Sequence, residues 1–181
     1  GVIALFIIFQ PEIRRFLQII GMRQKELGFI TRIFSQQHGE QLDTAPIVAA
    51  CRDMAETKTG ALIVIGQRSD LTLITEGGIA LNATVSQSLL KNIFFKNAPL
   101  HDGAVVINDN RIVAAKCILP VTQSDVPKSY GTRHRAAIGL SEISDAIIIV
   151  VSEETGGISI AHNGQLRRDI DPNRLAQAIN R

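Results

Sequence analysis

Apolar residues along this chain fall into short blocks whose spacing changes between a helical and an extended repeat. Two blocks, Gly60 to Gly66 and Ala146 to Val151, are continuously apolar over a length typical of strands covered on both faces of a sheet. We expect the first of them in the middle of the sheet. Turn residues at Asn108 to Asn110 and at Asn163-Gly164 predict hairpins. The other expected strands are Leu71 to Thr75, Ala104 to Ile107, Arg111 to Leu119 and Ile158 to Ala161.

Helical spacing marks the segments between these strands. A well-defined helix is expected from Thr44, whose side chain can cap it, with Pro46 in the first turn, where a missing N–H costs nothing. Further helices are expected over Ser86 to Phe95, from Thr132, and after Asp171-Pro172. Strands and helices alternate irregularly, and hairpins join several strands. The pattern therefore predicts a single α/β domain with a central mixed β-sheet flanked by helices on both faces.

The beginning of the chain departs from this pattern. Val2 to Phe9 is a continuous apolar run, but it is too short to cross a bilayer, which needs about twenty residues. A buried strand or helix start and the end of a transmembrane helix both remain open. The basic excess between Pro11 and Phe34 is typical of a cytoplasmic membrane flank and favours the second. We expect a transmembrane remnant over residues 1–10, a juxtamembrane connector helix over 11–43, and a cytoplasmic domain over 44–181.

Composition narrows the class of protein. The 181 residues are 45% hydrophobic, enough for one well-filled core. The net charge of +2 creates no field strong enough to indicate a nucleic acid polymer as partner, so a small anionic ligand is the better expectation. Cys51 and Cys117 lie in apolar stretches without metal-ligand spacing and are interpreted as buried thiols in a reducing compartment.

Candidate chemistry begins at Asp102-Gly103, just before a predicted strand. Asp-Gly is a common turn dipeptide, so a purely structural turn is at least as good an interpretation as a functional carboxylate. The strand that follows would nevertheless hold the carboxylate on a rigid element, and Gly103 and Ala104 leave room for a ligand to approach. A carboxylate placed there can hold a metal ion or accept a hydroxyl proton, and both are useful when an alcohol attacks a phosphate.

Cations gather at a second place, Arg133 to Arg135, in the first turn of a predicted helix. Exposed cations on an ordinary helix are the alternative, but the helix dipole disfavours cations at this end. A bound phosphate would reverse that cost, because it meets free N–H groups and guanidinium groups together. The adjacent acids in Ser152 to Thr155 are usual in solvated turns, although one could complete a divalent-metal site. No Walker-type glycine loop or Rossmann fingerprint occurs.

Taken together, these residues closely resemble the diadenylate cyclase family, whose hallmark motifs are Asp-Gly-Ala and Arg-His-Arg. Here the motifs are Asp102-Gly103-Ala104 and Arg133-His134-Arg135, and Gly60 to Ile65 and Leu119-Pro120 add to the likeness. The resemblance covers Thr44 to Ile170. Phe9 to Arg15, after the apolar run, is similar to the membrane-anchored branch of the family, in which three transmembrane helices precede the cyclase.

The resemblance implies that two ATP molecules become cyclic di-AMP and two pyrophosphates, with Mg²⁺ or Mn²⁺ required. Each 3′-hydroxyl attacks the α-phosphate of the other ATP. The catalytic residues that it implies are Asp102, Arg133 and His134. The nucleotide-binding residues that it implies are Gly103, Ala104, Leu119, Pro120, Thr132, Arg133, His134, Arg135, Ser152 and Glu153. The metal ligands that it implies are His101, Asp102 and Glu154.

The symmetry of the product adds a requirement. One protomer holding one ATP cannot close the ring, whereas two identical half-sites facing each other can, so catalysis requires a face-to-face homodimer. The resemblance further implies a bacterial cell membrane location, with a membrane-bound regulatory protein and a phosphoglucosamine mutase as partners. One departure is Ile118, where some members place an aromatic residue that can stack on adenine.

Two other functions compete with the cyclase. A regulator that binds adenine nucleotides without reacting them would not need the Asp102 carboxylate and could tolerate asparagine there. A monomeric nucleotidyltransferase acting on another alcohol is disfavoured, because no second substrate-binding motif is found.

Overall fold

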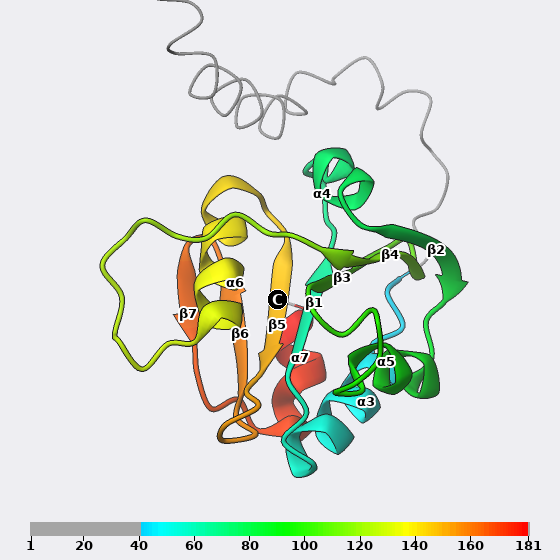
Figure 1. Ribbon diagram of the computed structural model, residues 1–181. Coiled ribbons are helices and arrows are strands. Elements are labelled where there is room, and N and C mark those ends of the chain that lie inside the picture. Colours follow the sequence, from blue (N-terminus) through cyan, green and yellow to red (C-terminus); the bar gives the residue numbers. More distant parts are fainter. Residues whose placement is uncertain (1–40, 181) are drawn as a thin grey trace, which may run out of the picture.

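The computed structural model describes residues 41–180, which form a seven-stranded sheet in the order β2-β4-β3-β1-β5-β6-β7 (Figure 1). Strands β1 and β3 are parallel, and the other neighbouring pairs are antiparallel. The strands are β1 Ala61–Ile65, β2 Ile79–Thr84, β3 Ala104–Asn108, β4 Arg111–Cys117, β5 Ile147–Val151, β6 Ile158–His162 and β7 Gln165–Arg167. The helices are α3 Ala45–Glu56, α4 Thr72–Glu76, α5 Gln87–Phe94, α6 Thr132–Ile143, the 3-10 helix η3 Pro172–Arg174 and α7 Leu175–Ile179.

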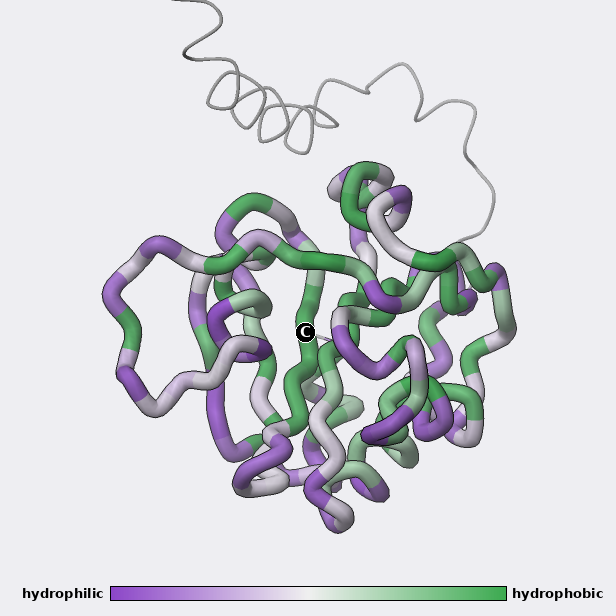
Figure 2. Tube along the Cα trace, viewed as in Figure 1, coloured by the Kyte–Doolittle hydropathy of each residue, from purple (hydrophilic) through white to green (hydrophobic). Residues whose placement is uncertain are grey.

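The central strand β1 is buried along its whole length, as its continuous apolar sequence predicts. Its side chains alternate between two cores: Ile63 and Ile65 belong to one, and Leu62 and Val64 to the other. Helices α3, α5 and α7 cover the first face, and α4 and α6 cover the second. Figure 2 shows β1 and β5 as hydrophobic strands at the centre of the molecule. The predicted mixed sheet with helices on both faces is confirmed.

The strand predicted over Leu71 to Thr75 is wrong, because this segment forms α4. The Asp70 carboxylate accepts hydrogen bonds from the N–H and the hydroxyl of Thr72, which starts a helical turn. Leu71 and Ile74 are then buried at a helical spacing. The next strand along the chain is β2, an edge strand that pairs with β4. Its residues are mostly exposed, so it lacks the apolar run that predicts a buried strand.

Turn and cap predictions are mostly confirmed. Hairpins join β3 to β4 and β6 to β7 at the expected places. Ser86 caps α5 and Asp171 caps η3 through their side chains. Thr44 makes no side-chain cap bond, contrary to expectation; instead Asp43 Oδ1 accepts the N–H of Ala45 at 3.1 Å. Pro46 does lie in the first turn of α3.

Both cysteines are buried and free, as predicted. Burial raises the pKa of Cys51 to about 12 and that of Cys117 to about 11. Neither thiol ionises near neutral pH, so neither serves as a nucleophile.

The predicted transmembrane remnant and residues 11–40 of the predicted connector lie outside the described residues, and residues 41–43 are not helical. No helix between residues 41 and 180 has the length and apolar character needed to span a bilayer.

Candidate active site

The predicted site residues gather at one edge of the sheet. The register pairs Ala61 with Val151 and Ala104 with Cys117. The N-terminal ends of the parallel strands β1 and β3 therefore lie beside the C-terminal ends of β5 and β4. We call this end of the sheet the site edge. The residues just beyond its strand ends are Gly60, Asp102, Gly103, Ile118, Leu119, Pro120, Ser152, Glu153 and Glu154. Residues distant in the sequence thus come together through strand register alone.

Helix α6 brings the Arg-His-Arg motif to the same edge. A Cβ atom at Gly60 would lie 2.7 Å from Cζ of Arg133, so the guanidinium group rests directly on the glycine backbone. Arg133 Nη1 also lies 3.3 Å from Glu153 Oε2. The Glu153 side chain is 61% exposed, and a pair with so much solvent access stabilises the fold by about 1 kcal/mol at most. Arg133 can therefore exchange this partner for a phosphate group at low cost.

A bulge sets the position of Asp102. Between the Ala104–Cys117 and Val106–Ala114 pairs, β4 contains one more residue than β3, and Lys116 there has a φ of 54°. Gly103 has a φ of +134°, and a Cβ atom on it would lie 2.8 Å from Lys116 Cα. Only glycine fits this close approach. The chain then leaves Asp102 exposed at the start of β3.

His101 and Asp102 offer adjacent oxygen and nitrogen donors. Nδ1 of His101 lies 2.7 Å from the Ala98 carbonyl oxygen, which can only accept, so Nδ1 carries a proton and Nε2 is the nitrogen that can offer a lone pair to a metal ion. An imidazole fixed in this way is typical of metal-ligating histidines. Within residues 41–180, however, no three His, Cys, Asp or Glu side chains are grouped closely enough to hold a metal. The role of Glu154 as a metal ligand stays a prediction.

His134 lies in the first turn of α6 and is 8% exposed. Burial lowers its pKa, and the Arg168 and Arg133 cations lower it further, whereas the Glu154 carboxylate opposes them. At neutral pH the imidazole is therefore uncharged and can act as a hydrogen-bond donor without carrying a net charge.

The N-terminus of α6 is open to a ligand. Gly131 is its N-cap residue, so no side chain caps the helix, and no acidic residue lies in the first turn. Thr132 is exposed there. Arg135, in contrast, turns back: its Nε donates to the Tyr130 carbonyl at 3.1 Å. Through this hydrogen bond Arg135 holds the end of the preceding loop against α6. Its contact with a nucleotide stays a prediction.

Several predicted binding residues have structural partners. Ala104 and Leu119 are buried in the core, which leaves Ile118, 81% exposed, as the apolar side chain beside them. The Ser152 hydroxyl accepts the N–H groups of Glu154 and Thr155 and so builds the turn after β5. Their contacts with a nucleotide stay predictions.

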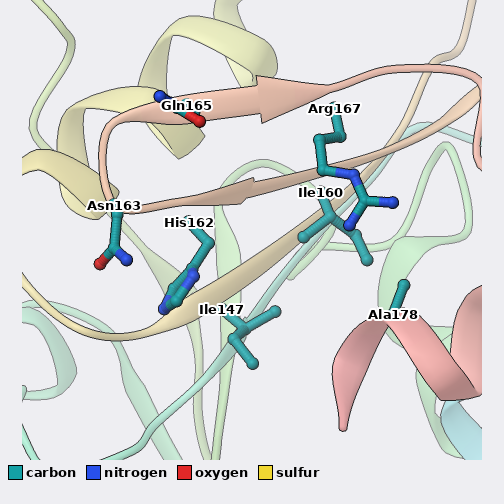
Figure 3. A pocket seen from close by; sticks show the side chains of 7 residues that line it. All are labelled: Ile147, Ile160, His162, Asn163, Gln165, Arg167 and Ala178. Carbon is teal, nitrogen blue, oxygen red and sulfur yellow. The ribbon is translucent and has the colours of Figure 1, made fainter. Parts of the chain in front are cut away.

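A small cavity of about 170 Å³ lies away from the site edge (Figure 3). It opens between the β6–β7 hairpin and α7, near the N-terminal end of β5. Its lining residues are Ile147, Ile160, His162, Asn163, Gln165, Arg167 and Ala178. None of them was a predicted site residue.

Several known proteins are similar to this chain in sequence and in fold. The cyclic di-AMP synthase CdaA of Bacillus subtilis (strain 168) is 44% identical over 181 residues, covering 99% of this chain and 65% of CdaA. The chain thus spans slightly less than two thirds of that relative. The crystal structure of a double mutant of DacA from Staphylococcus aureus is similar with a TM-score of 0.72 and 46% identity, covering 74% of this chain and 89% of DacA. A hypothetical membrane spanning protein from Bacillus cereus has a TM-score of 0.69 and 38% identity, covering 92% of this chain and 80% of that one.

A family match decides the classification. Residues 48–166 match the family described as DAC, DisA bacterial checkpoint controller nucleotide-binding. The matched range runs from α3 to β7 and includes both motifs and the whole site edge. The chain therefore belongs to the DAC family.

Proposed function

We propose that this chain carries a diadenylate cyclase, which condenses two ATP molecules into cyclic di-AMP with release of two pyrophosphates. One observation carries the proposal: the exposed carboxylate of Asp102 and the guanidinium group of Arg133 lie at the same edge of the sheet. Arg133 belongs to the first turn of α6, whose N-terminus is uncapped by any side chain. This is the combination that a hydroxyl attacking a phosphate needs. The similarity to a cyclic di-AMP synthase supports the choice of substrate and product.

Each half-reaction forms one bond and breaks one. A ribose 3′-oxygen bonds to the α-phosphorus of the other ATP, the bond from that phosphorus to its bridging oxygen breaks, and pyrophosphate leaves. Asp102 orients the 3′-hydroxyl and accepts its proton. Arg133, His134 and the free N–H groups of α6 bind the phosphate oxygens, where negative charge increases in the transition state. Thr132 adds a hydroxyl at the same helix end.

A divalent cation, Mg²⁺ or Mn²⁺, fits the donors at the site edge. Nε2 of His101 and the Asp102 carboxylate would hold it, with nucleotide phosphates completing the shell as is usual for Mg²⁺. When bound, the ion would neutralise charge on the triphosphate.

The productive assembly is a face-to-face homodimer. Each chain offers one carboxylate and one set of phosphate-binding groups, whereas the symmetric product needs two of each. Ile118 and Val121, 81% and 43% exposed, place apolar surface next to the site edge, which a second copy would cover. Adenine would contact the chain in this region, near Pro120.

We also propose a bacterial membrane location, with this domain in the cytoplasm. The similarity to a protein described as membrane spanning supports it, together with the apolar and basic pattern of the first residues. A membrane-bound regulatory protein and a phosphoglucosamine mutase remain the expected partners, and both would be sought by copurification with the full-length protein.

The decisive experiment is incubation of the purified chain with ATP and Mn²⁺, followed by chromatography of the nucleotides. We expect cyclic di-AMP from the wild type and none from Asp102→Asn, which should still bind ATP. Asp109→Asn is the matched control: it removes an exposed carboxylate from the β3–β4 hairpin, away from the site edge, and should retain activity. A wild type that binds ATP yet forms no product with Mg²⁺, Mn²⁺ or Co²⁺ would instead be an adenine-nucleotide-binding regulator.

A further inference from the structure

Three side chains from two distant parts of the chain form a stack beside the site edge. The Tyr130 and His134 ring centroids are 5.8 Å apart with an interplanar angle of 33°. On Tyr130, the Arg168 guanidinium carbon lies 5.2 Å from the ring centroid, within the range of a cation–π interaction. We call Arg168, Tyr130 and His134 the ring stack. It joins the end of β7 to the first turn of α6.

The ring stack fixes the point where a long loop enters α6. The loop runs from Ile118 to Gly131 and is largely hydrophilic along its outer part (Figures 1 and 2). At its end the Tyr130 carbonyl accepts from Arg135 Nε, and the Tyr130 N–H donates to the Pro127 carbonyl. The backbone of Tyr130 is thus held locally, whereas its ring contacts His134 and Arg168. The direction of the ring therefore depends on the stack.

The backbone just after Arg168 is held by β6. Two residues after it, the Ile170 N–H donates to the Ile158 carbonyl at 2.9 Å. Ile158 pairs with Val151, the last residue of β5, so this anchor lies at the site edge. The preceding residue, Arg167, pairs with Ile160 in the sheet and lines the cavity by α7 instead. Neighbouring arginines thus have different surroundings, although both are exposed.

We propose that Arg168 is a positioning residue: through the Tyr130 ring it holds His134 and the first turn of α6 in the orientation that receives the transferred phosphate. This inference rests on the proposed cyclase activity. Arg168 acts through another ring and is not itself a phosphate ligand. Arg168, Arg133 and Glu154 all act electrostatically on His134, and of these three Arg168 also contacts the intervening Tyr130 ring.

A small displacement of a group that positions the reacting atoms strongly reduces the reaction rate. Removing Arg168 frees the Tyr130 ring without removing any group that binds ATP. We therefore expect Arg168→Gln to lower kcat on the order of tenfold and to leave KM for ATP within about twofold. Arg167→Gln removes the same charge one residue away and should leave both values unchanged.

The pathway through Tyr130 is tested with double variants. In a Tyr130→Ala background, which already lacks the middle of the ring stack, Arg168→Gln should have no further effect on kcat. Tyr130→Phe keeps the ring and should retain activity. If Arg168→Gln raised KM instead of lowering kcat, or acted equally in the Tyr130→Ala background, Arg168 would be a direct phosphate ligand and the proposal would be wrong.

A second measurement does not depend on activity. The chain has no tryptophan and a single tyrosine, so its tyrosine fluorescence reports on Tyr130 alone. Without nucleotide, acrylamide should quench this fluorescence more strongly in Arg168→Gln than in the wild type or Arg167→Gln, at unchanged Tm. Equal quenching in all three proteins would overturn the ring stack even if the wild type is an active cyclase. Stronger quenching together with an inactive wild type would refute the proposed function and leave the stack standing.

Discussion

At the residue scale, the two glycines that flank β1 show how the absence of a side chain shapes the site. Gly60 precedes the strand and carries the Arg133 guanidinium on its backbone. Gly66 follows the strand at the opposite edge, where a Cβ atom would lie 3.1 Å from Asn108 Oδ1. Both contacts involve the ends of side chains that can move. Only the first involves a group that the proposed reaction uses.

We therefore expect Gly60→Ala to displace Arg133 and reduce cyclic di-AMP formation by on the order of tenfold or more, the loss expected when one charge-stabilising group is misplaced. The Tm should change little, because the guanidinium can move aside. Gly66→Ala is the control at the other end of the same strand and should remain active. Full activity in Gly60→Ala, measured in the same assay, would show that the Arg133 position is not critical.

His134 gives a prediction about pH. Its pKa in the folded protein lies below its ordinary value of 6.5, so below that pH the unfolded chain binds more protons than the folded one. The free energy of unfolding should fall as pH drops from 6.5 towards the lowered pKa. Above pH 6.5, His134 should add nothing to the variation of this free energy with pH. Urea unfolding at pH 7.5 and pH 5 measures the difference. His134→Gln should weaken this dependence; an identical loss in the variant would assign it to other groups.

At the element scale, α6 packs against the segment that follows β4. A Cβ atom at Gly139 would lie 2.0 Å from the Pro120 carbonyl oxygen and 2.7 Å from the Thr122 nitrogen. Thr122 in turn donates its N–H to the Arg135 carbonyl at 3.1 Å, so the segment is tied to the helix that it contacts. The helix therefore needs glycine where its sequence alone would favour alanine.

The two effects of Gly139→Ala can be compared in magnitude. Alanine gains about 1 kcal/mol of helix propensity over glycine in a helix interior. Overpacking against fixed backbone atoms costs about 1–3 kcal/mol and occasionally more. We expect net destabilisation, seen as a lower urea midpoint. Gly77→Ala, whose Cβ would lie 3.6 Å from the nearest atom, should be nearly neutral. A more stable Gly139→Ala would mean that the Pro120 segment moves away freely.

At the scale of the whole molecule, the prediction concerns assembly. If two facing half-sites perform the reaction, product formed per mole of protein should rise with protein concentration and level off when the dimer is saturated. Initial rates over a dilution series, with sedimentation measured on the same samples, test this. Constant specific activity at concentrations where the chain is monomeric would contradict the dimer mechanism.

Much of the fold follows from local patterns. The buried strands β1 and β5, the two hairpins and the start of α6 were all predictable, because each depends on a few neighbouring residues. The failures were also local. At α3 the side chain of Asp43, not that of Thr44, accepts the first N–H, and Asp70 starts a helical turn that hydropathy does not reveal. The edge strand β2 carries too little buried apolar surface to be recognised.

The sequence by itself determined the two motifs, the chemistry of their side chains and the single mixed sheet, since apolar periodicity and residue type are local properties. Tertiary structure alone decided which groups meet. Strand register brought Asp102 and Gly60 to one edge, and the packing of α6 placed the Arg133 guanidinium on Gly60. The return of the chain after β7 placed Arg168 on Tyr130. Such contacts join residues far apart in the chain, and they depend on packing that no short stretch of sequence encodes.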